Sequence, residues 1–122
     1  MREIKFRAKT CNGEWVQGLL AHKDNKWYIS NKAGQPFAFE VRPETICQYI
    51  GLKDNNGKEI YEGDIVEIWA EDEYLLLEWD KDTAQFVMSG SNFEVDFDNY
   101  WSDELEVIDN IFDNPQLIER GN

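Results

Sequence analysis

Three carboxylate residues, Glu59, Glu62 and Asp64, lie close together in the chain and could form a site for acid–base chemistry. The residues around them favour a structural role. Gly63 gives the backbone conformational freedom, and an aspartate ahead of a β-branched strand can accept hydrogen bonds from nearby backbone N–H groups. We therefore interpret these carboxylates as turn formers and surface charges, and we predict no catalytic residue among them.

Other candidates for chemistry lack the pattern that their chemistry requires. His22, the single histidine, has no nucleophile or orienting acid in a recognisable pattern near it. The segment DFDN at residues 96–99 begins like a calcium loop, but Trp101 and Val107 stand where such a loop needs Gly and Glu. No P-loop, nucleophile elbow or zinc motif is present. The sequence thus predicts no catalytic, cofactor-binding or metal-binding residue.

Aromatic residues in the acidic half of the chain are the stronger candidates, and they point to binding. The members of this predicted interaction surface are Trp69, Tyr74, Trp79, Tyr100 and Trp101. Carboxylates and aromatic faces both attract cations, so together they could take a peptide or a basic ligand. Two alternatives stay open. The rings could fill a small core, or an exposed patch of them could form an oligomer interface.

Charge divides the 122-residue chain, whose net charge is −13, into two unlike halves. Residues 1–63 carry ten Lys or Arg and eight Asp or Glu, whereas residues 64–122 carry two and 17. An acidic field repels phosphate backbones and anionic lipids, so direct nucleic-acid binding is unlikely. The basic row of Arg2, Lys5, Arg7 and Lys9 is weak evidence for it. The acids can serve solubility, or they can imitate the phosphates of a nucleic acid.

Short β-strands are the elements that must position these side chains. Apolar and polar residues alternate with period two, as in residues 4–8 and 37–41, which is the pattern of a half-buried strand. Turn signals separate the strands, and the strongest is DNNG at residues 54–57. About nine short strands, with a turn every eight to twelve residues or so, predict an all-β barrel or sandwich.

Pro43 and the shift in charge divide the predicted fold into a small β-sheet, residues 1–45, and an acidic barrel, residues 46–122. The first piece is too short to bury a full core, so it must pack on the second piece or on another subunit. A short C-terminal helix is expected, with Asn114 as its N-cap and Pro115 as its first residue. Residues 43–46 could hold one helical turn.

The segment GLKDNNGKEIYEGDIV, residues 51–66, resembles the signature of the YopX-like proteins of bacteriophages and prophages. Residues 2–8, 43–51 and 107–117 resemble the segments that flank it in that family. The resemblance implies a small β domain followed by an SH3-like β-barrel, and multimers. It also implies a phage- or prophage-encoded origin, and it transfers no catalytic residue.

The two cysteines, Cys11 and Cys47, can form at most one disulfide and lack histidine partners for a metal site. We expect them to be reduced structural thiols in the bacterial cytoplasm, because no signal peptide is apparent. No apolar run approaches the roughly 20 residues that span a bilayer, so no membrane contact is expected.

Three functional hypotheses follow. The leading one is a non-enzymatic phage accessory protein that forms homo-oligomers and binds a host or phage protein. The alternative is an acidic nucleic-acid mimic that occupies a basic host protein. An enzyme is the third, and it would need a deep pocket lined by converging carboxylates.

Overall fold

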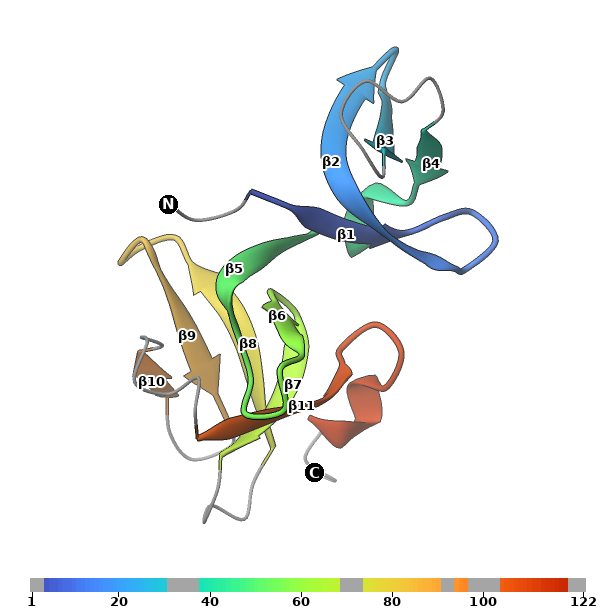
Figure 1. Cartoon of the computed structure of the whole chain (residues 1–122). Helices are drawn as coiled ribbons and strands as arrows, with labels where there is room; N and C mark the ends of the chain where they lie inside the picture. The colour runs from blue at the N-terminus through green and yellow to red at the C-terminus, as the bar shows by residue number, and fades with distance from the viewer. Residues whose placement is uncertain (1–3, 31–37, 69–73, 91–93, 97–103, 119–122) are drawn as a thin grey trace. The chain divides into compact units, whose positions relative to one another are not determined.

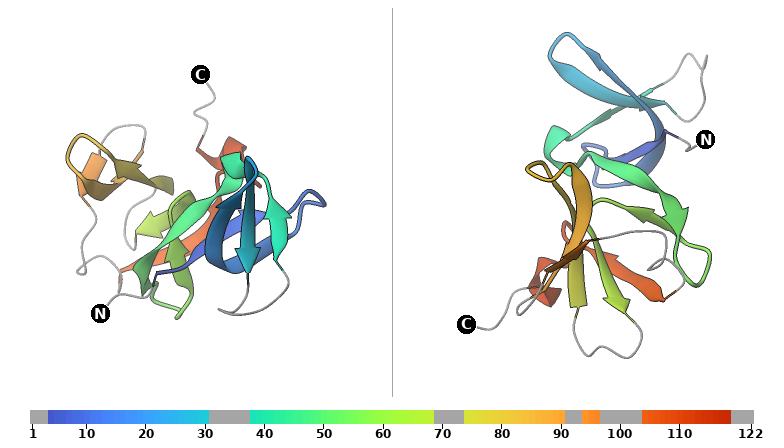
Figure 2. Two further views of the ribbon diagram at one scale, coloured as in Figure 1. Left: turned by 90° about the horizontal axis from the view of Figure 1, so that it is seen from above. Right: turned by 90° about the vertical axis from the view of Figure 1, so that its left-hand side faces the viewer.

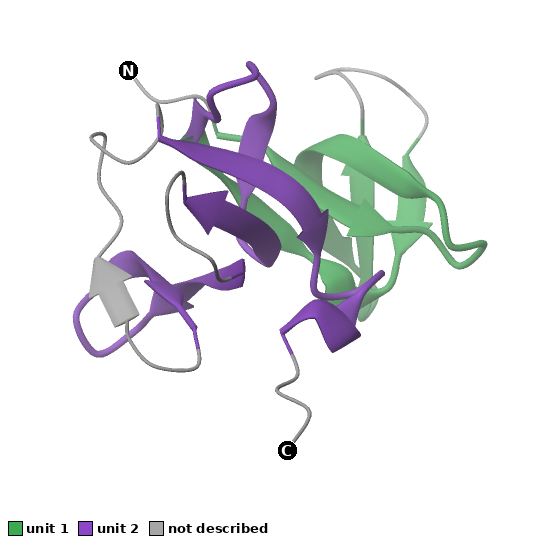
Figure 3. Ribbon diagram, turned by 90° about the horizontal axis from the view of Figure 1, so that it is seen from below, with its two compact units in different colours: residues 1–51 green, residues 52–122 purple. Residues whose placement is uncertain are grey.

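A computed structural model describes residues 4–30, 38–68, 74–90, 94–96 and 104–118. The described chain is mainly antiparallel β-structure, which confirms the mainly β part of the predicted fold (Figure 1). It divides into two compact units, residues 1–51 and 52–122 (Figure 3). The boundary expected after residue 45 lies ahead of the strand Cys47–Lys53, and this strand runs across the division at residues 51 and 52.

Unit 1, residues 1–51, is a sheet with the strand order β4-β3-β2-β1-β5. Its strands are β1 (Phe6–Lys9), β2 (Trp15–Lys23), β3 (Lys26–Ser30), β4 (Phe39–Val41) and β5 (Cys47–Lys53). Ala8, Ile29 and Val41 form the centre of its core. The strand registers place these three side chains on one face, as the period-two pattern predicts.

A single 3₁₀ turn, η1 (Pro43–Thr45), connects β4 to β5 and confirms the helical turn expected at residues 43–46. The buried Thr45 hydroxyl accepts a hydrogen bond from the Lys9 N–H at 2.9 Å and donates one to the Arg42 carbonyl at 2.7 Å. Both hydrogen-bonding capacities of the hydroxyl are thus used. Thr45 ties the turn to β1.

Unit 2, residues 52–122, contains a five-stranded antiparallel sheet with the order β10-β9-β8-β7-β11 (Figure 2). Its strands are β7 (Asp64–Ile68), β8 (Tyr74–Asp80), β9 (Gln85–Ser89), β10 (Glu94–Asp96) and β11 (Leu105–Asn110), and β6 (Glu59–Tyr61) neighbours β5. One face of the sheet is apolar and buried, and its members are Val66, Ile68, Leu75, Leu77, Met88, Leu105 and Val107.

Asp54 joins the β5–β6 turn to the outer edge of β11. Its Oδ1 accepts hydrogen bonds from the backbone N–H groups of Asn56 at 2.9 Å and Lys58 at 2.8 Å. Its Oδ2 accepts one from Val107 at 2.9 Å. The Asn55 N–H also donates to the carbonyl of Leu105 at 3.0 Å. The turn therefore pairs backbone N–H and C=O groups on the open edge of β11. If these groups were left unpaired, they could pair with a strand of another chain.

Gly63 occupies the turn between β6 and β7 with a φ of 88°, a conformation that favours glycine. Its N–H donates to the Leu77 carbonyl at 2.7 Å, and its carbonyl accepts from Ile111 N–H at 2.9 Å. The buried Asp64 carboxylate accepts from the Tyr61 N–H at 2.8 Å and closes the same turn. Turn formation by Gly63 and Asp64 is as the sequence predicts.

The prediction of a C-terminal helix was wrong. Asn114 and Pro115 begin only a 3₁₀ turn, η2 (Pro115–Leu117), and no α-helix occurs among the described residues. The Asn114 Oδ1 accepts the side-chain amide of Gln116 at 2.7 Å, while its amide donates to Asp109, so this oxygen caps no backbone N–H. An uncapped helix this short is also unstable by itself.

The SH3-like barrel that the resemblance implies is not confirmed. The described strands of unit 2 form an open sheet with β10 and β11 at its two ends, and no closed barrel is found among them. None of the helical segments in the described part of the chain is long and apolar enough to cross a membrane.

Replacing Asp54 by asparagine is expected to lower the free energy of unfolding by about 2 kcal/mol, because an amide group facing the Val107 N–H leaves a buried donor unsatisfied. Asp24→Asn removes the same charge from an exposed turn, and should change stability by less than about 0.5 kcal/mol. Urea unfolding of both variants measures the difference. Equal midpoints would show that Asp54 contributes no more than a surface carboxylate.

Acid should destabilise the protein in part through Asp54. Burial alone would raise the pKa of this carboxyl, but the N–H donors of Val107, Lys58 and Asn56 and the Lys58 ammonium lower it below its ordinary value. Its stabilisation is therefore complete above the unfolded-state pKa of about 3.9 and is lost as pH falls through the lower, folded-state pKa. The urea midpoint of the unaltered protein should thus fall more steeply below about pH 4 than that of Asp54→Asn. Parallel pH profiles would contradict this assignment.

Candidate functional site

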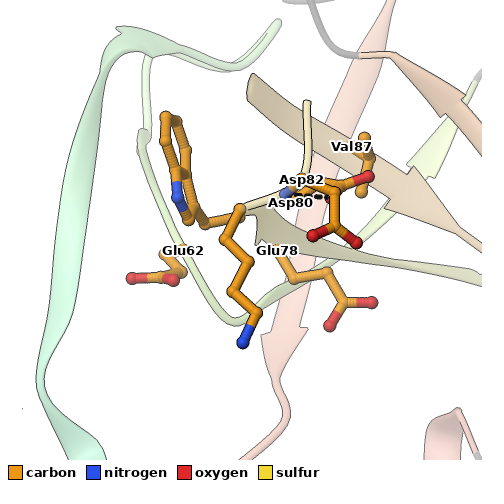
Figure 4. A pocket seen from close by; sticks show the side chains of 7 residues that line it. Glu62, Glu78, Asp80, Asp82 and Val87 are labelled. Carbon is orange, nitrogen blue, oxygen red and sulfur yellow. Dashed lines mark hydrogen bonds between the residues drawn. The ribbon is translucent and has the colours of Figure 1, made fainter. Parts of the chain in front are cut away.

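The β8–β9 hairpin and the β6–β7 turn of unit 2 line an open cavity of about 450 Å³ (Figure 4). Its lining combines one aromatic ring with several charged groups, and the lining residues are Glu62, Glu78, Trp79, Asp80, Lys81, Asp82 and Val87. We call this cavity the acidic pocket. Glu62 lies apart from Asp80 and Asp82 across the pocket in Figure 4. The volume is in the range of natural ligand sites.

Trp79 reaches the pocket because the apolar face of β8 extends beyond the core. Leu75 and Leu77 are fully buried on that face, and strand alternation places Trp79 on it as the next member. Trp79 is nevertheless 46% exposed. The paired residue on β9, Phe86, packs its ring edgewise against the indole with centroids 5.0 Å apart. The indole is therefore supported on one side and open to solvent.

The charge of the pocket is strongly negative, since four carboxylates face one ammonium group, that of Lys81. Two of the carboxylates are held in place by hydrogen bonds. Glu78 Oε1 accepts the Ser89 hydroxyl at 2.9 Å, and Asp80 Oδ1 accepts the Asp82 N–H at 2.9 Å. The second oxygen of each has no hydrogen bond to the described residues and can accept one from a ligand.

An open indole beside several carboxylates can bind an organic cation. An ammonium or guanidinium group is attracted to the face of a tryptophan and to the carboxylates together. Among the described residues, no group of three or more His, Cys, Asp or Glu side chains converges as metal ligands, and this includes the carboxylates of the acidic pocket. The indole and the carboxylates that line the acidic pocket are thus the groups that can bind a cationic side chain.

The predicted aromatic surface is described only in part. Trp79 lies in the acidic pocket, and Tyr74 is the half-buried first residue of β8. Strand alternation places these two side chains on opposite faces of the sheet. Trp69, Tyr100 and Trp101 lie outside the described residues, so the five-residue surface stays a prediction.

The other sequence candidates have structural partners. Glu59 accepts the Tyr61 hydroxyl at 3.0 Å, and among Glu59, Glu62 and Asp64 only Glu62 lines the acidic pocket. His22 stacks on the ring of Trp27 with centroids 4.4 Å apart.

The two cysteines are free thiols in unit 1. Cys11 is exposed, whereas Cys47 is buried and its thiol donates to the Thr45 carbonyl at 3.3 Å. Residues 96–99, whose spacing to Trp101 and Val107 does not fit a calcium loop, lie partly outside the described residues.

Sequence reasoning missed the role of the turn that holds Asp80, Lys81 and Asp82. Its sequence, DKD, indicates only a polar connection between two strands. The available signal was an aromatic residue, Trp79, directly ahead of a turn with acids on both sides of a lysine. The contribution of Glu62, which is distant in sequence, could not be read from such a local pattern.

Comparison with known proteins identifies one family. The family model described as YopX protein matches residues 5–119, which is nearly the whole chain. No curated protein gives a significant match.

Trp79→Ala is expected to cost only about 1 kcal/mol of unfolding free energy, because a half-exposed ring loses mainly its contact with Phe86. Leu77→Ala removes a fully buried side chain from the same face of the same strand and should cost about 3 kcal/mol. Urea unfolding of the two variants tests this order. A large loss for Trp79→Ala would mean that the indole is a core residue instead of part of an open site.

Proposed function

The chain belongs to the YopX protein family, and from that membership and the acidic pocket we propose that it is a non-enzymatic protein that acts by binding proteins, its own copies included. The observation that carries the proposal is Trp79, a 46% exposed indole in a cavity with four carboxylates. Tryptophan is enriched among the residues that contribute most to protein–protein binding, which is why an accessible indole in a cavity supports this proposal.

The pocket suits a lysine or arginine side chain presented by a protein. One cation would lie against the indole of Trp79, and Glu78 and Asp80, which alternation places on the opposite face of β8, would accept the N–H groups of a second one. Rim carboxylates such as Asp82 would mainly accelerate association and confer salt sensitivity. A segment of another protein with one or two exposed cations is thus the proposed ligand, from a host protein, a phage protein or another copy of the chain.

The proposed setting is the cytoplasm of a bacterium that carries the phage or prophage. Two observations support it, the family membership and the two free thiols, Cys11 and Cys47. Free thiols are the usual state in a reducing compartment.

A nucleic-acid mimic is the second candidate, and one observation favours it. Glu67 on β7 lies directly opposite Glu106 on β11, a pairing of like charges that destabilises a sheet. The registers place Glu78 and Asp80 on the same face as Glu67. A row of acids with such repulsion can occupy a phosphate-binding surface of a basic host protein.

A fluorescein-labelled tetra-arginine peptide provides a direct test of the acidic pocket. Trp79→Ala should weaken its binding about tenfold, since a partly desolvated cation–π contact contributes roughly 1–2 kcal/mol. Asp80→Asn/Asp82→Asn should weaken binding to a similar extent of about tenfold in low salt and less in high salt. Asparagine retains the oxygen that accepts the Asp82 N–H, so the turn is preserved.

The matched control is Glu104→Gln/Glu106→Gln, which removes the same charge from residues outside the acidic pocket. Fluorescence anisotropy of the labelled peptide gives the affinities. The pocket is not the binding site if the control and the Asp80/Asp82 variant weaken binding equally.

A further inference from the structure

We propose that the acidic pocket of one copy receives the tip of the β2–β3 hairpin of a second copy, through Lys23 and Lys26. The inference deepens the proposed function and rests on it, because it names the partner of the same pocket. Four features of the tip and of the chain lead to it: the turn geometry, an unfavourable pair of lysines, their exposure, and the charge of the two units.

The tip is a rigid two-residue turn at an extremity of unit 1 (Figures 1 and 2). Asp24 and Asn25 have φ angles of 54° and 65°, so both central residues are left-handed, as in a type I′ turn. Aspartate and asparagine tolerate this conformation better than most residues. Such a turn fixes the backbone positions of the two flanking residues, so a partner that binds them orders their side chains and little additional backbone.

The flanking residues are Lys23 and Lys26, which are directly paired across the hairpin. The Cα atoms of residues paired in this way lie about 4.5–5.5 Å apart, and like charges at such positions destabilise a sheet. A local interaction that works against the fold is characteristic of positions selected for another purpose. Paired residues project from the same face of the hairpin, so the two ammonium groups can enter one site on a partner together.

Both ammonium groups are accessible. Lys23 is exposed and has no ion pair with a described residue. Lys26 lies 4.0 Å from Glu40, and the two side chains are 57% and 44% exposed. An exposed ion pair at that distance contributes little binding energy, so the Lys26 ammonium group can bind another carboxylate. On the other face of the hairpin, the His22 and Trp27 rings stack and stiffen the tip.

The complementary surface is present on the same chain. Unit 1 contains eight Lys or Arg and five Asp or Glu, whereas unit 2 contains four and 20. The acidic pocket concentrates the negative charge and adds the open indole of Trp79. A doubly cationic tip fits a pocket with four carboxylates better than a single cation does, because both ammonium groups find acceptors.

Because tip and pocket are different surfaces, this contact is heterologous. Repetition of a heterologous contact gives a closed ring or an open filament, whereas a symmetric two-fold dimer buries the same patch on both copies. Each copy in such an assembly uses its tip on one neighbour and its pocket on the other.

Two variants separate the surfaces. In the tip variant, Lys23→Thr/Lys26→Thr, a favourable threonine pair replaces the like charges, so the hairpin should be as stable as before or more so. In the pocket variant, Glu78→Lys/Asp82→Lys, the charge of the pocket is reversed. Sedimentation velocity over a concentration series should show assembly of the unaltered chain and an apparent dissociation constant about tenfold higher for each variant, the loss of about two exposed ion pairs.

Mixing the two variants is the decisive step. The tip variant keeps an intact pocket and the pocket variant keeps an intact tip, so one productive contact can form between them. The mixture should therefore give dimers and nothing larger, while each variant alone stays monomeric at the same concentration. Urea unfolding of each variant confirms that both are folded.

The outcomes distinguish this inference from the proposed function. Binding of tetra-arginine at the acidic pocket, combined with a monomeric unaltered chain at every concentration, would overturn the inference and leave the proposed function intact. Assembly that persists in the tip variant would also overturn it. A third outcome would also overturn it: a labelled single-stranded oligonucleotide binds the unaltered chain but not the tip variant, and the two proteins sediment alike. The tip would then be a nucleic-acid contact. If tetra-arginine does not bind at the pocket, the proposed function itself fails.

Discussion

The carboxylate of Asp54 accepts hydrogen bonds from backbone N–H groups in two distant parts of the chain. The arrangement of unit 2 depends on this acceptor, which the two parts share. Two of its donors shape the β5–β6 turn, and the third belongs to β11, an end strand of the five-stranded sheet. One side chain therefore closes a turn and covers an edge. Gly63 acts similarly in the next turn, where its backbone bonds to Leu77 and Ile111. Asp54, Gly63 and Asp64, three residues of the segment that carries the family resemblance, therefore have structural roles in its turns.

The length of β8 explains where a binding site can form. The apolar side chains of β7 and of β8 as far as Leu77 pack in the core. The part of the β8–β9 hairpin that follows Leu77 extends beyond the core. Trp79 and Phe86 lie on this extension, where they pack against each other. The β6–β7 turn, fixed by Gly63 and Asp64, brings Glu62 to the same cavity. The side chains that line the acidic pocket are therefore ones that the core does not bury, and they lie on strands and turns that the core and the turn hydrogen bonds hold in place.

Local patterns in the sequence predicted much of this fold, and long-range contacts account for what they missed. The period-two alternation, the DNNG turn and the 3₁₀ turn at Pro43 depend on neighbouring residues, and the structure contains all three. The C-terminal helix was expected from Asn114 and Pro115, but the Asn114 side chain bonds Asp109 and Gln116 instead of capping a helix. The bond from Val107 to Asp54 spans 53 residues, and the meeting of Glu62 with the β8–β9 hairpin has no local signal. Trp79 was identified as a binding candidate, whereas the carboxylates around it were not.

The separation between Asp54 and Val107 also has a consequence for the order of events on the ribosome. At a synthesis rate of about 5–20 residues per second, the donor on β11 is made several seconds after its acceptor. During that interval the carboxylate can bind only Asn56 and Lys58, and a lone hairpin is marginally stable. Strands β7 and β8 meanwhile have an unpaired edge, the state in which nascent β-sheets aggregate. The contact that stabilises the finished sheet thus makes its completion a late step, and the edge of β7 stays open until β11 has been made.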